Sequence, residues 1–280
     1  MIRMAIKAIA LDIDGTLTTD EKVIPRRTKQ VLLAAQEAGI TVILASGRPA
    51  YGLKGLAAEL ELDRHHGLLI SFNGARVIDA TTDEILFDQA MTADEVRSVL
   101  SHMKRFDVIP MVTHGRELCV TDAFAGPIYH RGKPVNIIRY EARACDLLVR
   151  EVGDLAEFCH GPESKILTAG TDTYLQEHWR EMYEPFKGRL SGMFTADFYF
   201  EFTAPGIDKG RALAGALPRR GIDASELVAF GDGQNDLAMI RFAGTGVAMG
   251  NAIPELKQAA DMVTLSNNDE GVAAALEKLL

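Results

Sequence analysis

A run of seven residues at positions 40–46, Ile-Thr-Val-Ile-Leu-Ala-Ser, constrains the fold of this chain more than any other segment. The run is almost continuously apolar and rich in β-branched residues, which is typical of a parallel strand buried on both faces. Helical patterns precede and follow it, at residues 25–39 and 48–62. A buried strand between two helices indicates a doubly wound α/β sheet that carries helices on both sides.

The alternation of strands and helices occurs in two blocks. The first begins with a strand at residues 6–11 and ends with a strand at 67–74, and the second extends from a helix at 208–221 to a final helix at 270–280. The segment between the blocks mixes short strands with helices, which indicates an α+β unit.

We therefore predict an α/β fold with a doubly wound, Rossmann-like parallel sheet core and an inserted α+β cap domain. The core domain is expected to comprise residues 1–82 and 189–280, and the inserted cap residues 83–188. Within and around the insert we expect the following elements: a hairpin at 75–89, a helix at 92–106 with a capping box of Thr92 and Glu95, two strands at 108–122, a polar stretch at 126–136, a helical stretch near 141–150, a strand at 164–170, a helix at 171–186 and strands at 189–204.

The composition is that of a globular protein, with 47% hydrophobic and 25% charged residues. A net charge of −9 argues against a nucleic-acid partner, which needs a basic stripe, but it allows a small phosphorylated ligand bound by local donors. No apolar run reaches the roughly 18 residues of a membrane-spanning helix. Lys7 and Asp12 interrupt the N-terminal apolar run, so we interpret it as a core strand and expect a cytoplasmic protein without a membrane partner.

The three cysteines, Cys119, Cys145 and Cys159, show no CxxC spacing. An odd number of cysteines without such spacing predicts reduced, packed thiols rather than a disulfide framework or a zinc site.

Polar side chains follow the predicted core strands where these end, and ligands of open α/β sheets bind at the C-terminal ends of the strands. The residues concerned are Asp12 and Asp14 after the first strand, Ser46 and Arg48 after the second, Asp232, Asn235 and Asp236 after a later strand, and Lys209 at a helix start. Each has an ordinary alternative. Asp14 can form a turn, Ser46 can cap a helix and Lys209 can be a solvated surface residue.

Three carboxylates that converge without a cation would repel one another, so the set favours a metal site. Asp12, Asp14 and Asp232 are hard oxygen ligands, and Mg²⁺ is therefore the expected cofactor. Beside a cation Asp12 stays ionised and is a candidate nucleophile that forms an aspartyl-phosphate, while Asp14 is placed to act as acid and base. Three further side chains, together with backbone N–H groups, are expected to bind the phosphoryl oxygens: Ser46, Lys209 and Asn235.

Four motifs carry a family resemblance. DIDGTL resembles the first motif of the haloacid dehalogenase-like hydrolases, LASGR the second, IDKG the third and GDGQND the fourth, with the insert between the second and the third. The segments SFNGARV (71–77) and GVAMGNAIPELKQAADMVTLSNNDEGV (246–272) look like the Cof-type subfamily of capped small-molecule phosphatases.

The resemblance implies a role for each matching residue. Asp12 becomes the nucleophile and a Mg²⁺ ligand, and Asp14 becomes the acid and base and binds the metal through its backbone carbonyl. Asp232 becomes a further metal ligand, which Asp236 supports indirectly or through water. The residues implied to hold the phosphoryl group are the Ile13 amide, Ser46, Gly47, Lys209 and Asn235. An aspartate at position 14 resembles the phosphatases and phosphomutases rather than the dehalogenases.

The insert is expected to act as a cap that chooses the leaving group. The candidate substrate contacts are Arg48, His114 and Arg131, and Tyr129, His130 and Lys133 are further polar candidates. The insert candidates can equally be surface residues, and Arg48 can simply pair with an acidic neighbour. We expect the single tryptophan, Trp179, to pack against the sheet of the insert.

The sequence thus predicts a Mg²⁺-dependent phosphatase acting on phosphomonoesters of small metabolites, such as sugar phosphates or phosphorylated cofactors. Two alternatives stay open: a phosphomutase that passes the phosphoryl group to a second hydroxyl, and a non-catalytic sugar-phosphate binding protein. The expected partner is a small phosphorylated metabolite, and the sequence does not indicate an oligomeric state.

Overall fold

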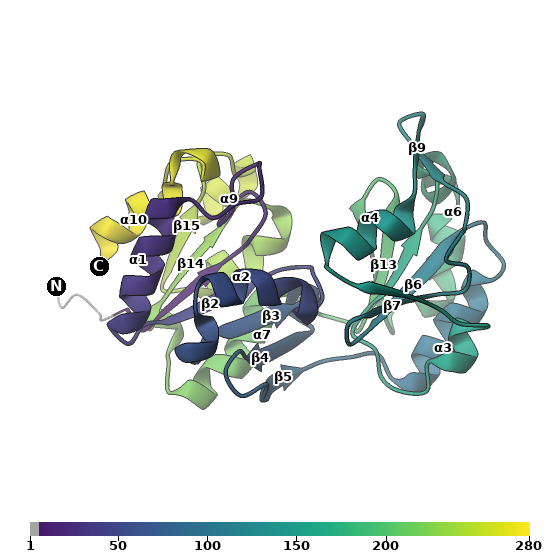
Figure 1. The fold of residues 1–280 in the computed structure, drawn as a ribbon, viewed down its shortest axis with the longest axis horizontal. Helices are drawn as coiled ribbons and strands as arrows, with labels where there is room; N and C mark the ends of the chain where they lie inside the picture. Colours follow the sequence, from purple (N-terminus) through teal and green to yellow (C-terminus); the bar gives the residue numbers. More distant parts are fainter. Residues whose placement is uncertain (1–5) are drawn as a thin grey trace. The chain divides into compact units, whose positions relative to one another are not determined.

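The computed structural model describes residues 6–280, and the chain divides into two compact units (Figure 1). The first unit combines the chain up to Asp88 with Asp208–Leu280, and the second is Gln89–Ile207. In Figure 1 the purple and blue N-terminal elements share one unit with the green and yellow C-terminal elements. The boundaries predicted after residues 82 and 188 are therefore wrong by about one strand and one hairpin respectively, because residues 83–88 pair within the first unit and residues 189–207 within the second.

An eight-stranded sheet with the order β16-β15-β14-β1-β2-β3-β4-β5 forms the first unit. Neighbouring strands are parallel from β16 to β3, and β4 and β5 add an antiparallel hairpin at one edge. The strands are β1 (Ala8–Leu11), β2 (Thr41–Ala45), β3 (Leu68–Ser71), β4 (Arg76–Asp79), β5 (Ile85–Asp88), β14 (Leu227–Gly231), β15 (Thr245–Ala248) and β16 (Met262–Val263). The α/β fold with a parallel sheet, predicted from the run at 40–46, is confirmed.

β1 occupies the centre of this sheet, between β2 and β14. All four of its residues are buried, and Leu11 lies opposite Leu44 on one side and Phe230 on the other. Strands from both blocks of the sequence thus pair with β1. Because β1 leads directly to Asp12, this pairing on both edges fixes the position of Asp12.

Helices cover this sheet and share one apolar core with it. Leu32 of α1 and Leu276 of α10 are fully buried in that core, and Figure 1 shows these two helices side by side. The helices are α1 (Arg26–Glu37), α2 (Lys54–Glu59), α7 (Lys209–Ala216), α8 (Leu237–Phe242), α9 (Pro254–Ala259) and α10 (Gly271–Leu279). The helix expected at 48–62 is shorter than predicted, since 3₁₀ turns at Ala50–Leu53 and Leu62–Arg64 flank α2.

The second unit contains a six-stranded sheet with the order β10-β7-β6-β11-β13-β12 and a separate two-stranded hairpin, β8–β9. Its strands are β6 (Ile109–His114), β7 (Glu117–Val120), β8 (Ile128–His130), β9 (Lys133–Val135), β10 (Leu148–Glu151), β11 (Ile166–Ala169), β12 (Ser191–Ala196) and β13 (Tyr199–Thr203). Its helices are α3 (Ala93–Met103), α4 (Ile137–Ala144), α5 (Leu155–Phe158) and α6 (Asp172–Tyr183).

Several local predictions for this unit hold, and two do not. α3 begins with the predicted capping box, in which Thr92 and Glu95 bond each other's backbone N–H groups. Trp179 packs against Phe194 and Phe200 of the sheet, as expected. However, the polar stretch at 126–136 contains the β8–β9 hairpin. The stretch near 141–150 is helical only to Ala144, because the chain turns at Asp146 (φ +51°) and enters β10.

The three cysteines are buried and form no disulfide among the described residues, as predicted. None of the described helices is both long and apolar enough to cross a membrane.

Candidate active site

Three carboxylates meet at the C-terminal ends of β1 and β14 in the first unit. Asp12 directly follows β1, Asp232 directly follows β14, and Asp236 ends the 3₁₀ turn Gln234–Asp236. One oxygen of each lies within 4.8 Å of the others. Asp12 and Asp236 are buried, with 7% and 0% of their surface exposed. Three of the four acidic residues predicted from separate motifs are thus brought together by the parallel pairing of β1 and β14.

Lys209 supplies the positive charge of this group. It is the first residue of α7 and is fully buried. Its Nζ donates to Oδ1 of Asp12 at 2.5 Å and to Oδ1 of Asp236 at 2.7 Å. Burial alone would lower the pKa of Lys209, but the charges of the two carboxylates outweigh this effect and raise it. The alternative interpretation of Lys209 as a solvated surface lysine is therefore wrong.

Asp236 holds the other members of the group in place. While its Oδ1 accepts from Lys209, its Oδ2 accepts from the backbone N–H groups of Asp232 and Gly233, each at 2.9 Å. Both oxygens are thus engaged within the protein. This pattern suits a residue that supports the site better than a direct ligand of a metal.

The electrostatics of the group fit a divalent cation. Burial raises the pKa of Asp12 to about 7, Asp236 adds to this effect and Lys209 opposes it. Burial also raises the pKa of Asp232. Three carboxylates face one ammonium, and Asp12 and Asp232 each keep one oxygen without a hydrogen bond among the described residues. Hard oxygen donors with uncompensated negative charge are the donor set that Mg²⁺ prefers.

Gly15 and Thr16 place the carboxylate of Asp232. Thr16 Oγ1 donates to Asp232 Oδ1 at 2.8 Å. Gly15 has a φ of +84°, and a Cβ added to it would lie only 2.5 Å from Asp232 Oδ2. Only glycine fits both the backbone and the space. Sequence reasoning missed Thr16, although its place directly after the acidic pair was a usable signal.

Asp14 lies outside the group of three carboxylates and has two cationic partners. Lys22 Nζ donates to its Oδ1 at 2.9 Å, and Arg48 donates to both of its oxygens at 2.9 Å. Burial alone would raise the pKa of Asp14, but Lys22 and Arg48 lower it below the usual range. Arg48 therefore has the acidic partner that the sequence allowed. Lys22 was missed because no local pattern links it to Asp14.

The predicted phosphate-binding residues follow β2 and β14. Ser46 is buried, and its Oγ accepts the N–H of Arg48 at 3.2 Å. Pro49, not Ser46, caps the following 3₁₀ turn, so the helix-cap alternative for Ser46 is wrong. Asn235 Nδ2 donates to Asn73 Oδ1 at 3.1 Å. Asn73 also lies against Gly47, where a Cβ would come within 3.0 Å of its amide nitrogen, and it was missed at the sequence level.

Ile13 lies between the two aspartates and is fully buried. Its carbonyl accepts from the N–H and the hydroxyl of Thr18, at 3.0 and 3.1 Å. The chain therefore folds back on itself directly after Asp12, which fixes the backbone on which the Ile13 amide lies.

The predicted contacts of the insert lie in the second unit, at exposed turns. His114 Nδ1 lies 3.5 Å from Glu163, and 66% of the histidine side chain is exposed. Arg131, in the β8–β9 turn, pairs with Asp197 at 3.2 Å and is 77% exposed. Within the second unit, His114 and Arg131 have different acidic partners and do not form one cluster.

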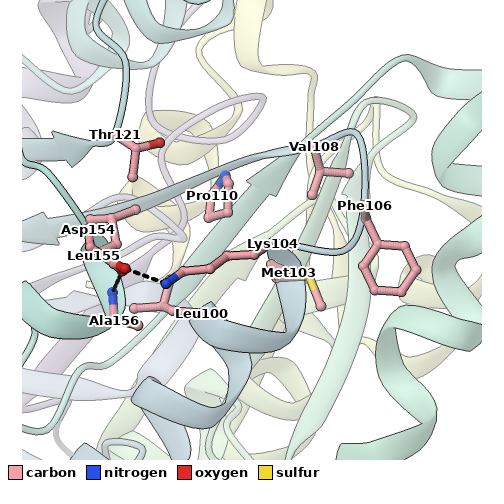
Figure 2. Close-up of a pocket in the computed structure, with 10 residues that line it drawn as sticks. All are labelled: Leu100, Met103, Lys104, Phe106, Val108, Pro110, Thr121, Asp154, Leu155 and Ala156. Atoms are coloured by element: carbon pink, nitrogen blue, oxygen red, sulfur yellow. Dashed lines mark hydrogen bonds and ion pairs between the residues drawn. The ribbon is translucent and has the colours of Figure 1, made fainter.

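Figure 2 shows a pocket of about 270 Å³ in the second unit, between α3, β6 and the start of α5. Most of the residues that line it are apolar, and the ion pair of Lys104 and Asp154 lies at one side. No predicted site residue lines this pocket.

Comparison with known proteins agrees with the fold. A family model described as haloacid dehalogenase-like hydrolase matches residues 9–276. A candidate phosphatase of Streptococcus pyogenes serotype M6 is 31% identical over 285 residues, covering 98% of both chains. The 5-amino-6-(5-phospho-D-ribitylamino)uracil phosphatase YcsE of Bacillus subtilis is 30% identical over 97% of this chain and 94% of its own.

The solved structures agree as well. A haloacid dehalogenase-like hydrolase from Bacteroides thetaiotaomicron superposes with a TM-score of 0.90 at 33% identity, covering 98% of this chain and 100% of that chain. The chain therefore belongs to the haloacid dehalogenase-like hydrolases, and it is an enzyme of the phosphatase kind within that family.

Proposed function

We propose that this protein is a Mg²⁺-dependent phosphatase that hydrolyses phosphomonoesters of small metabolites through an aspartyl-phosphate on Asp12. The observation that supports this most is the buried arrangement of Asp12, Lys209 and Asp236 beside Asp232. It combines a carboxylate nucleophile, a fixed cation and uncompensated negative charge at the strand ends. The substrate named for the Bacillus subtilis relative is a phosphorylated metabolite, which supports the same substrate class here.

Asp12 and Asp232 would hold the metal through their free oxygens, together with the backbone carbonyl of Asp14, and Asp236 would support them. When bound, Mg²⁺ would neutralise charge on the phosphate and keep Asp12 ionised beside the anionic substrate. The remaining chemistry belongs to the side chains of the chain itself.

The phosphoryl group would be held by donors that surround Asp12. Lys209 is buried and fixed between two carboxylates, so it presents a positive charge at one place. Charge on the equatorial oxygens grows in the transition state, and fixed donors there lower the barrier. The other groups proposed to bind these oxygens are Ser46, Gly47, Asn235 and the Ile13 amide.

The reaction would proceed in two displacements. A carboxylate oxygen of Asp12 attacks phosphorus, the bond from phosphorus to the ester oxygen breaks, and Asp14 gives its proton to the departing alkoxide. In the second step Asp14 takes a proton from water while the water oxygen attacks phosphorus, which releases inorganic phosphate and restores Asp12. Before the first step, Asp14 has to loosen its pairs with Lys22 and Arg48 and take up a proton.

Within this proposal the second unit serves as the cap that selects the leaving group, with Arg48, His114 and Arg131 as candidate contacts. Location in the cytoplasm remains part of the proposal, and the buried free thiols fit a reducing compartment.

Phosphate release from a panel of phosphomonoesters, with Mg²⁺ and with chelator, tests the function. The wild-type protein should release phosphate only with the metal, and Asp12→Asn should lose nearly all turnover while keeping its fold. Near-normal activity of Asp12→Asn would remove the nucleophile assignment. Transfer that requires an acceptor hydroxyl would favour a phosphomutase, and binding without turnover would favour a sugar-phosphate binding protein.

A further inference from the structure

Asparagines from the segment 246–272, which the proposed chemistry does not use, bind the loop that follows Asp14. Asn251 Nδ2 donates to the carbonyl of Gly15 at 2.8 Å. Asn251 Oδ1 in turn accepts the backbone N–H of Asn267 at 3.1 Å. The loops after β15 and β16 are thus joined to each other and to the first residue after Asp14.

Asn267 carries the connection further along the loop. It is buried, with 3% of its surface exposed. Its Nδ2 donates to the carbonyl of Thr18 at 3.0 Å and to Asp20 Oδ1 at 3.2 Å. Since a buried amide is costly unless it is bonded, these contacts account for the presence of a polar side chain at this place.

Asn268 completes the connection at Asp20. The backbone N–H of Asp20 donates to Asn268 Oδ1, and Asn268 Nδ2 donates to Asp20 Oδ2, both at 3.0 Å. Together the three asparagines, which we call the asparagine bracket, hold residues 15–20 at Gly15, Thr18 and Asp20.

The loop held by the asparagine bracket leads to Lys22, one of the two cationic partners of Asp14. Beyond Asp20 the chain makes a tight turn, in which Thr19 N–H donates to Val23 O and Lys22 N–H to Thr19 O, both at 2.9 Å. Lys22 adopts a φ of +63° in this turn, and its ammonium reaches Asp14 at 2.9 Å. The loop therefore begins beside Asp14 and brings Lys22 back to it.

Stability alone does not explain where the bracket lies. Leu17 and Ile24 of the same segment are buried at 1% and 7% exposure in the apolar core, so the loop already has apolar anchors. The bracket instead bonds Gly15, Thr18 and Asp20, of which Asp20 is exposed. Its effect is on the position of the loop relative to Asp14.

We propose that Asn251, Asn267 and Asn268 are positioning residues for proton transfer, which hold the loop 15–22 so that the carboxyl of Asp14 stays within reach of the leaving oxygen. This inference rests on the proposed phosphatase function. A poor leaving group such as a simple alkoxide needs the proton, whereas 4-nitrophenolate departs without it. Loosening the asparagine bracket should therefore slow the hydrolysis of alkyl phosphates more than that of 4-nitrophenyl phosphate.

The test compares kcat/KM for an alkyl phosphate and for 4-nitrophenyl phosphate in Asn267→Ala and Asp20→Ala. Asp20 is exposed, so Asp20→Ala should fold even if Asn267→Ala does not. We expect a loss of about tenfold or more on the alkyl ester and less than about twofold on the nitrophenyl ester, since general acid catalysis contributes 10²–10⁴-fold when it is intact. Asp14→Asn gives the upper limit of this selectivity.

Asp269→Ala is the matched control, because Asp269 is an exposed aspartate of the same loop that bonds Ser266 and not the loop 15–22. It should leave both substrates unchanged. An equal loss on both esters in the Asp20 and Asn267 variants, or no loss in either variant, would overturn the inference while the proposed function stands. If the wild-type protein releases phosphate from neither ester, the proposed function falls, and the inference falls with it.

Discussion

One guanidinium nitrogen of Arg48 lies 2.9 Å from each carboxylate oxygen of Asp14. The ammonium of Lys22 lies 2.9 Å from one of the same oxygens. The residue proposed to deliver a proton is thus held by two cations in its ionised form. The structure therefore describes a resting arrangement, from which Asp14 has to be released for the first displacement.

Replacing Arg48 by methionine should move the alkaline limb of the kcat/KM profile to higher pH. Arg48 lowers the pKa of Asp14, so its loss raises that pKa and keeps the acid protonated over a wider range. The measurement is the pH dependence of kcat/KM on an alkyl phosphate. Arg64→Met, which removes an exposed arginine paired with Glu61, serves as the control. If KM rose while the alkaline limb of the profile stayed in place, Arg48 would instead be identified as a substrate contact.

Replacing Gly15 by alanine should weaken Mg²⁺ binding at least tenfold. The new Cβ would lie 2.5 Å from Asp232 Oδ2 and displace a proposed ligand. Gly39→Ala is a matched control, because Gly39 has a similar φ of +87° but nothing within 4 Å of the added Cβ. Both variants should lose about 1 kcal/mol of stability through backbone strain, and only Gly15→Ala should lose metal affinity, as calorimetric titration would show. Equal affinities would contradict the role given to Asp232.

Removing the metal should make stability depend on pH through Asp12. Its pKa is about 7 in the folded protein against 3.8 for the ordinary side chain, so the native state holds this proton more tightly than the unfolded chain does. Stability in chelator should therefore fall as the pH rises from about 4 to about 7 and then level off. Mg²⁺ needs the ionised carboxylate, so the Tm increase on adding Mg²⁺ should be larger at pH 8 than at pH 5.5. Asp12→Asn should lose both effects, and an unchanged pH slope in that variant would count against the assignment.

Asp79, at the end of β4, should stabilise the first unit at neutral pH but not in strong acid. Burial alone would raise its pKa, but hydrogen bonds from Thr82 N–H, His66, Thr81 N–H and Arg220 lower it to about 2. The stabilisation, about 2 kcal/mol by linkage, is present above pH 4 and is lost as the pH falls towards 2. The free energy of unfolding in denaturant checks this. Asp79→Asn should be less stable than the wild-type protein at pH 6, and the difference should shrink at pH 2.5. Asp88→Asn, which removes a partly exposed ion pair with Arg76, should change stability by less than about 1 kcal/mol.

Replacing Lys165 by methionine should destabilise the second unit by about 3 kcal/mol, because it leaves Glu201 charged and unpaired in a buried place. The two groups lie 2.9 Å apart with 9% and 6% of their side chains exposed, and Thr195 also donates to Glu201. The double variant Lys165→Met with Glu201→Leu should recover most of the loss in urea denaturation. If the single and double variants were equally unstable, the loss would come from packing and not from the unpaired charge.

The candidate site was largely predictable because its chemistry lies in short motifs at strand ends. Asp12, Ser46, Lys209 and Asp232 each stand next to a recognisable strand or helix pattern, and parallel pairing brings such positions to one edge. The role of Thr16 was missed although its place two residues after Asp14 was a signal, whereas the roles of Lys22 and Asn73 were not predictable in this way. Each acts through one side-chain contact, and the left-handed backbone of Lys22 and Asn73 leaves no periodic signal.

The unit boundaries were misplaced for a related reason. β5 and the β12–β13 pair look like ordinary strands in the sequence, and only their partners decide to which unit they belong. β5 pairs with β4, and β13 pairs with β11, but strand pairing depends on residues distant in the chain. Local sequence patterns identify a strand more readily than they identify the strand with which it pairs.

The central place of β1 between β2 and β14 also determines the order in which the site is completed during synthesis and folding. A ribosome delivers Asp12 before the second unit is made and Lys209 only after it. Until β14 follows, the nascent β1 has one unpaired edge, and the carboxylate beside it lacks its counter-charge. Pairing across the whole insert is a contact of high sequence separation, which folds slowly. The proposed nucleophile, Asp12, is thus synthesised before the other residues of the site, but it gains its partners only when the last of them has folded into place.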